Sequence, residues 1–185
     1  MYTQIYASNH LARYNHVVRG LYFDALANLP CTEMVKPNGL SFDSMRGVFL
    51  HLTLVEDRWV SYIITERFKE WVDPDFEAFK DIAALKQFML QVQGNTEVYM
   101  SGHLADELNR QIAIPWGHRP DTKINVETAL CHMVMENMVH YSELSAPLWQ
   151  MGLEAPYLGF RRYKNMNPIL AKVYVFSVYY IDCDF

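Results

Sequence analysis

The chain has 185 residues, of which 51% are apolar and 20% are charged, and its net charge is -5. This composition is typical of one globular domain with its own core and argues against a disordered chain. The acidic balance offers no basic surface for nucleic acid, and no uncharged apolar run approaches the ~20 residues that span a bilayer. The first residues lack the basic and apolar regions of a secretory signal, so we expect a cytoplasmic protein that binds neither nucleic acid nor membranes.

The first half of the chain predicts two long helices. Apolar residues spaced three and four apart predict a helix over about residues 2–28. After a turn at Pro37-Asn38-Gly39, a second helix is expected to reach about residue 68. Ser41 or Asp43 is the expected cap at the start of this second helix.

The second half of the chain predicts two more helices. The third is expected over about residues 83–112, with weak points at Gly94 and Gly102, because glycine lowers helix stability. The fourth is expected to begin near residues 122–125 and to end at Gly152, which suits a left-handed cap.

Four amphipathic helices with connections of medium length predict an all-α fold, a four-helix bundle formed by residues 1–160. The rest of the chain, residues 161–185, differs in composition. It is rich in aromatic and β-branched residues, which favour strands. We therefore expect an irregular or strand-like C-terminal tail outside the bundle.

The fourth predicted helix carries His132, Glu136 and His140 at intervals of four residues. At 100° per residue, His140 falls inside the apolar stripe of this helix and Glu136 at its edge, whereas His132 falls outside it, at the rim. His51 borders the apolar face of the second helix. A bundle that joins these edges would bring His51, Glu136 and His140 together. A divalent metal ion would then satisfy the buried carboxylate, which is costly to leave without a partner.

The same residues also have plainer interpretations. A single inward histidine is usually a hydrogen-bonded core residue, and Glu136 can pair with a basic side chain or face solvent. The zinc-protease motif HExxH is absent, and the Glu-x-x-His pair of di-iron bundles is not found. The other histidines are expected at the surface or only partly buried; they are His10, His16, His103 and His118. The aromatic residues Trp59, Tyr62 and Trp149 can either line an apolar pocket or pack in the core.

Two segments resemble the motifs of a known family. The segment SMRGVFLHLTLVEDRW, residues 44–59, and the segment LCHMVMENMVHYSELSAPLWQMG, residues 130–152, are similar to the two motifs of the DinB superfamily of metalloenzymes. Tyr14-Asn15 resembles the Tyr-Asn pair that the family carries on its first helix. The resemblance spans roughly residues 5–160. It implies a DinB-like bundle of up-down-down-up topology with one crossover connection, usually as a homodimer.

The resemblance also implies a metal site. Carried over position by position, the ligands of the divalent ion are His51, Glu136 and His140. In much of the family the middle ligand is histidine, so Glu136 is a departure, and Tyr141-Ser142 stands where Arg-Gly is usual. Zinc or nickel is the expected metal, and iron is compatible with two histidines and one carboxylate. Characterised relatives include thiol-dependent transferases, in which the metal lowers the pKa of a small thiol.

Two functions follow as hypotheses. The first is a divalent-metal-dependent transferase or hydrolase that acts on a small molecule, with a low-molecular-weight thiol as its partner. In this enzyme His132 or Tyr141 would orient groups at the ion or shuttle protons. The second is a non-catalytic, stress-associated dimeric bundle with a structural metal or none. An open coordination position would favour the enzyme.

Overall fold

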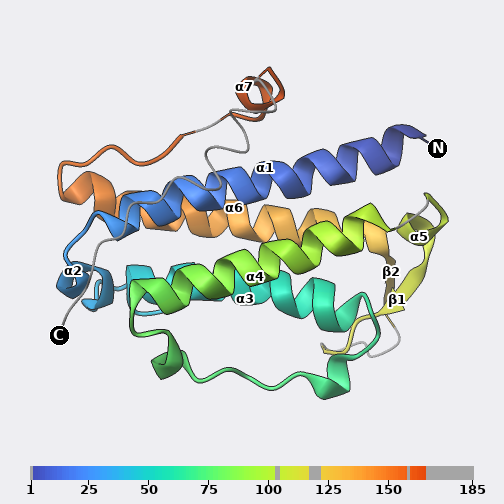
Figure 1. Ribbon diagram of the computed structural model, residues 1–185, viewed down its shortest axis with the longest axis horizontal. Coiled ribbons are helices and arrows are strands. Elements are labelled where there is room, and N and C mark those ends of the chain that lie inside the picture. Colours follow the sequence, from blue (N-terminus) through green and yellow to red (C-terminus); the bar gives the residue numbers. More distant parts are fainter. Residues whose placement is uncertain (1, 103–104, 117–121, 158, 166–185) are drawn as a thin grey trace.

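The computed structural model describes residues 2–102, 105–116, 122–157 and 159–165. Four long helices dominate it: α1 (Tyr2–Ala27), α3 (Met45–Asp57), α4 (Ile82–Ser101) and α6 (Val126–Gln150). They lie side by side, and the chain runs in one direction through α1 and α6 and in the opposite direction through α3 and α4 (Figure 1). The expected all-α bundle with up-down-down-up topology is therefore confirmed.

A long crossover connects α3 with α4. The end of α3 continues into a wider turn of π-helix, η1 (Arg58–Ile63). Two short 3-10 helices, η2 (Phe68–Glu70) and η3 (Phe76–Phe79), then lie on the path back along the bundle (Figure 1). Because this segment returns the chain to the end at which α3 began, α4 can run parallel to α3.

The start of α3 differs from the expectation. Ser44 is the cap, and its hydroxyl accepts a hydrogen bond of 3.1 Å from the Gly47 amide. Ser41 and Asp43 were the expected caps, but they lie in the preceding loop, where Asp43 has a positive φ of 67°. The helix therefore begins later than predicted, which leaves Ser41 free for a different contact.

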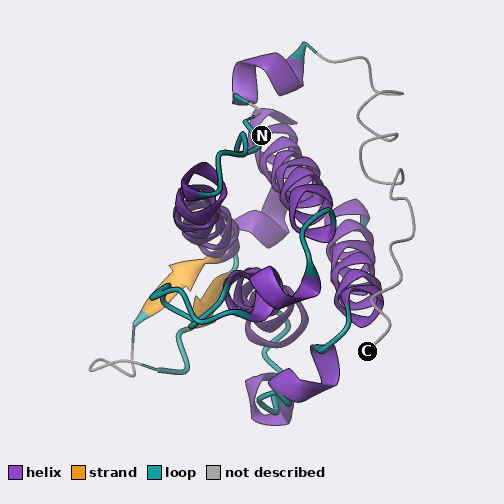
Figure 2. Ribbon diagram, turned by 90° about the vertical axis from the view of Figure 1, so that its left-hand side faces the viewer, coloured by secondary structure: helices purple, strands orange, loops and turns teal. Residues whose placement is uncertain are grey.

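The third predicted helix is too long. The observed helix, α4, ends at Ser101 and is followed by a short helix, α5 (Ala105–Asn109). Strand β1 (Gln111–Ala113) then pairs antiparallel with β2 (Lys123–Asn125) beside the bundle (Figure 2). The prediction of helix through residue 112 is wrong because Ile112 is fully buried in a strand, opposite Ile124.

The fourth predicted helix is confirmed. The Asn125 side chain caps α6 by accepting a hydrogen bond of 2.8 Å from the Thr128 amide, and Gly152 follows the helix with a φ of +74°. Two further short helices are α2 (Cys31–Val35) and α7 (Phe160–Lys164). The strand-like tail was expected from residue 161, but its first residues are helical in α7, and residues 166–185 lie outside the described part. The boundary at residue 160 stays a prediction.

The core lies between the four long helices. Phe23 of α1 packs against Phe49 of α3, with ring centroids 5.7 Å apart. Trp59 is buried, in agreement with core packing, whereas Trp149 is exposed. Among the described residues, no helix is both long and apolar enough to cross a membrane.

Candidate metal site

Helices α3 and α6 place three ligand-type side chains together. His51 comes from α3, and Glu136 and His140 lie one turn apart on α6. One possible ligand atom from each residue lies within 4.8 Å of the others. The side chains are 17%, 29% and 13% exposed, in that order, so solvent reaches all three. The structure therefore brings together the three residues that the sequence singled out.

The donor set suits a divalent transition metal. His51 Nε2 lies 3.8 Å from Glu136 Oε1, and the rings of His51 and His140 are 4.8 Å apart. Around an ion with bonds of about 2.0 to 2.2 Å, ligand atoms are separated by about 3.0 to 3.5 Å. Modest rotations about side-chain bonds would close this difference. Two imidazoles and one carboxylate therefore fit zinc, nickel or iron, in number and in chemistry.

The surroundings of the Glu136 carboxyl favour its ionised form, which is the form that binds a metal ion. Its pKa lies below the ordinary value, mainly because of the interaction with His51. Burial opposes this shift, whereas the nearby His132 and His140 reinforce it. The side chain is therefore ionised near neutral pH, as a metal ligand must be.

His132 lies at the rim, as expected. Its Nε2 atom is 3.4 Å from Glu136 Oε2, and its side chain is 57% exposed. The ring meets Trp59 edge-on, with centroids 5.4 Å apart. His132 is thus next to the ligand set and open to solvent, where a group that exchanges protons with water has to be.

Tyr141 lies elsewhere, and its expected role at the ion needs correction. Its hydroxyl donates a hydrogen bond of 3.0 Å to Asn15 Oδ1, and its ring stacks on Tyr22 at 4.9 Å. Both partners belong to α1, and the side chain is buried. Burial raises the pKa of the Tyr141 phenol. The residue follows His140 directly, and a step of 100° around the helix turns it to the core instead of to the ligands.

Glu143 joins the site, although the sequence did not single it out. Its Oε2 atom lies 2.9 Å from His140 Nδ1. Ser41 donates to the same carboxylate twice, from its hydroxyl at 2.8 Å and from its backbone amide. The spacing of three residues from His140 on one helix was the available signal. The contact with Ser41 left no such signal in the sequence, because Ser41 lies 102 residues away from Glu143 along the chain.

Phe42 covers the other histidine of the set. Its ring stacks on His51, with centroids 3.7 Å apart and an interplanar angle of 17°. It also meets His140 edge-on at 5.7 Å. One side of the ligand set is therefore closed by an aromatic ring.

A second polar cluster lies inside the bundle and was missed. Glu56 is fully buried and accepts hydrogen bonds from Asn15, His16 and Thr96 at 3.2, 2.8 and 2.6 Å. Arg19 is also fully buried, and its Nη1 atom lies 3.0 Å from Glu56 Oε2. His16 was expected at the surface or partly buried, but it is only 3% exposed. The sequence shows each of these residues but not the depth at which they meet.

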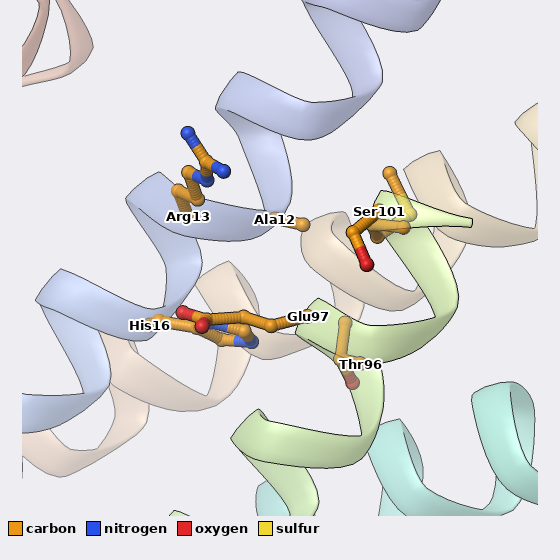
Figure 3. A pocket seen from close by; sticks show the side chains of 7 residues that line it. Ala12, Arg13, His16, Thr96, Glu97 and Ser101 are labelled. Carbon is orange, nitrogen blue, oxygen red and sulfur yellow. The ribbon is translucent and has the colours of Figure 1, made fainter. Parts of the chain in front are cut away.

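A small pocket opens beside this cluster, between α1 and α4. Its volume is about 40 Å³, and its lining includes Arg13, His16, Thr96, Glu97 and Ser101. His16 and Glu97 lie next to each other there (Figure 3), with His16 Nδ1 3.9 Å from Glu97 Oε1. The pocket has room for about three water molecules at ~10–15 Å³ each. It is separate from the metal-ligand residues.

The fold and the site together define a class, helical bundles with two histidines and one carboxylate gathered between two helices. The family model described as the DinB family matches residues 1–172, so the chain belongs to the DinB family. The resemblance inferred from the two motifs is thereby confirmed. No protein with a curated description matches the chain.

Proposed function

We propose that this protein is a divalent-metal-dependent enzyme of the DinB type, with His51, Glu136 and His140 as the ligands. The convergence of these three side chains from α3 and α6, each still partly exposed, carries the proposal. Three protein ligands leave coordination positions for water or substrate, which is typical of catalytic sites, whereas structural sites are closed by four. Membership in a metal-associated family supports the same conclusion.

The side chains at the site have different proposed roles. When bound, the divalent ion lowers the pKa of a coordinated water or small thiol and so supplies a nucleophile near neutral pH. Glu136 contributes the negative charge that holds the ion, and His51 and His140 contribute neutral nitrogen donors. His132, at the rim and 3.4 Å from Glu136, is placed to accept or return a proton at Nε2.

The substrate side of the proposal is a small molecule processed by transfer or hydrolysis, with a low-molecular-weight thiol as co-substrate. Soft thiolate ligands bind zinc and nickel well, which supports a thiol as the group that enters the open positions. The proposal also includes a cytoplasmic homodimer. Sedimentation of the purified chain tests the dimer.

Metal content tests the proposal first. The purified protein, loaded with zinc and desalted, is expected to retain about one ion per chain, whereas His51→Ala and Glu136→Ala are expected to lose it. Glu127→Ala, on the same helix but outside the ligand set, is the matched control and should retain the ion. Retention of stoichiometric metal by both ligand variants would contradict the assignment.

The thiol is tested on the cobalt-loaded protein. Coordination of a thiolate adds an intense sulfur-to-cobalt absorption, which is absent when water alone fills the open positions. We expect this absorption on addition of a small thiol. A spectrum that is unchanged at saturating thiol would favour hydrolysis over thiol transfer. If the metal-loaded protein showed no metal-dependent activity at all, the non-catalytic bundle would be favoured instead.

A further inference from the structure

We propose that the loop of residues 39–44, which we call the Ser41 loop, acts with Glu143 as a positioning device for His140 and His51. The inference rests on the proposed function, because these two histidines are its ligands. Ser41 and Phe42 are neighbours in the chain, yet Ser41 contacts Glu143 of α6 and Phe42 stacks on His51 of α3. Glu143 and the loop residues are positioning residues, since they act through the histidines.

The first part of the device fixes which nitrogen of His140 is free. Glu143 accepts two hydrogen bonds from Ser41, so its carboxylate is an acceptor, and the contact with His140 Nδ1 at 2.9 Å needs a proton on that nitrogen. The Nε2 atom of His140 then keeps its lone pair for an ion. A carboxylate on the remote nitrogen of a metal-binding histidine is the usual way in which proteins fix its tautomer and ring orientation.

The second part fixes the ring of His51. Phe42 lies flat against this imidazole at 3.7 Å, which restricts its rotation and keeps solvent from one of its faces. The Nε2 atom at the edge of the same ring lies 3.8 Å from Oε1 of Glu136, another proposed ligand. The stacked ring therefore holds His51 in the orientation in which it faces α6.

The loop itself is fixed on α3, so it can serve as a support. Residues Leu40 and Asp43 form a bridge, and the Asn38 amide donates to the Asp43 carbonyl at 2.9 Å. The loop packs against Gly47 so closely that a Cβ atom at this position would overlap the Phe42 carbonyl oxygen. Glycine at position 47 therefore allows the Ser41 loop to lie directly on the helix that carries His51.

Metal affinity tests the device, with Glu143→Gln as the main variant. Glutamine keeps the size of the side chain but removes its charge. Loss of such a supporting carboxylate typically weakens metal binding about 10–100-fold, and we expect the dissociation constant for zinc to rise by this factor. Glu127→Gln on the same helix is the matched control and should bind like the unmodified protein. An unchanged dissociation constant in Glu143→Gln would overturn the inference.

A double substitution separates positioning from a merely structural role. If Glu143 acts through His140, its replacement should matter little once His140 is alanine, because the interaction is already lost. We therefore expect the affinities of His140→Ala and of His140→Ala with Glu143→Gln to be equal within about twofold. Additive losses in the double variant would mean that Glu143 acts through the fold instead.

The metal-free protein gives a readout that does not depend on the proposed function. Nitrogen NMR of the His140 ring should show the proton on Nδ1, and Glu143→Ala should abolish this preference, while thermal stability reports whether the variant still folds. A proton on Nε2 in the unmodified protein would overturn the inference even if zinc binds. If zinc does not bind but the proton lies on Nδ1, the proposed function fails and the contact has another role.

Discussion

Glu56 is a carboxylate whose partners all lie inside the bundle. It is fully buried, and Arg19 is buried with it, 3.0 Å away. Arg19, His16 and hydrogen bonds from His16 and Thr96 hold the pKa of Glu56 well below its ordinary value, although burial opposes the shift. Removal of one member of a buried pair leaves the other charge without compensation, which costs far more than the pair contributes as a whole.

We therefore predict that Glu56→Ala destabilises the protein by about 3–5 kcal/mol, because Arg19 is left buried and unpaired. Urea denaturation of both proteins provides the measurement. Glu77→Ala is the control, because Glu77 pairs with Lys80 in an exposed ion pair that is worth about 0–1 kcal/mol. A loss in Glu56→Ala as small as that of the control would contradict a charged, buried pair.

His16 should make stability depend on pH. Burial lowers the pKa of His16, but the Glu56 charge and hydrogen bonds to Glu56 and Glu97 outweigh burial, despite opposition from Arg19, so the pKa rises above 6.5. A raised pKa means that the folded protein binds the proton more tightly than the unfolded chain does. The resulting stabilisation is complete below pH 6.5 and is lost as the pH rises through the folded-state pKa.

The predicted outcome is a melting temperature that falls as the pH rises above about 6.5, with a smaller fall in His16→Gln. Differential scanning calorimetry across this range compares the two slopes. Since the two proteins differ only at position 16, the difference between the slopes reports on His16. Identical slopes would mean that folding leaves the pKa of His16 unchanged, and a steeper fall in His16→Gln would mean that His16 is neutral in the folded protein.

At the scale of single residues, the sequence predicted the candidate metal ligands but not the side chains that contact and position them. Helical spacing on one segment indicated Glu136 and His140, an apolar edge indicated His51, and the resemblance to the family joined the three as one ligand set. Tyr141 was misplaced because its neighbour in sequence, His140, lies on a different side of the helix. Glu143 was missed because its importance depends on Ser41, which reaches it only in the folded chain.

At the scale of the elements, the start of α3 depends on a glycine with no space for a side chain. A Cβ atom at position 47 would meet the backbone of Phe42, which cannot rotate away as a long side chain could. Gly94, in contrast, lies on α4 with nothing within 4 Å of an added Cβ. The two glycines therefore offer a matched pair of substitutions with opposite expected signs.

Gly47→Ala should destabilise the protein by about 1–3 kcal/mol, because the loop has to shift. Gly94→Ala should stabilise it by roughly 0.5–1 kcal/mol, because alanine favours the helix and limits the unfolded chain. Chemical denaturation measures both. Equal effects of the two substitutions would show that the loop does not press on α3 as closely as described.

The elements also show where sequence patterns lose information. The long helices followed from periodic apolar residues, since the pattern repeats over many turns. The third one was extended too far because β1 is only three residues long and is defined by pairing with β2, which the local pattern does not contain. The cap of α3 was misassigned among closely spaced candidates, since Ser41, Asp43 and Ser44 all have suitable side chains.

At the scale of the whole molecule, an ion held between α3 and α6 should stabilise the fold. A ligand that binds only the folded state adds about 2.7 kcal/mol at a concentration 100 times its dissociation constant. We predict that zinc raises the melting temperature of the unmodified protein and leaves that of His51→Ala unchanged. An equal rise in both would place the ion elsewhere.

The most direct measurement is a crystal structure of the zinc-loaded protein with anomalous scattering recorded at the zinc edge. We predict one strong peak between α3 and α6, about 2.0–2.2 Å from a nitrogen of His51, an oxygen of Glu136 and Nε2 of His140. Full zinc occupancy at another place, with these three side chains making no contact to the ion, would contradict the assignment of His51, Glu136 and His140 as its ligands.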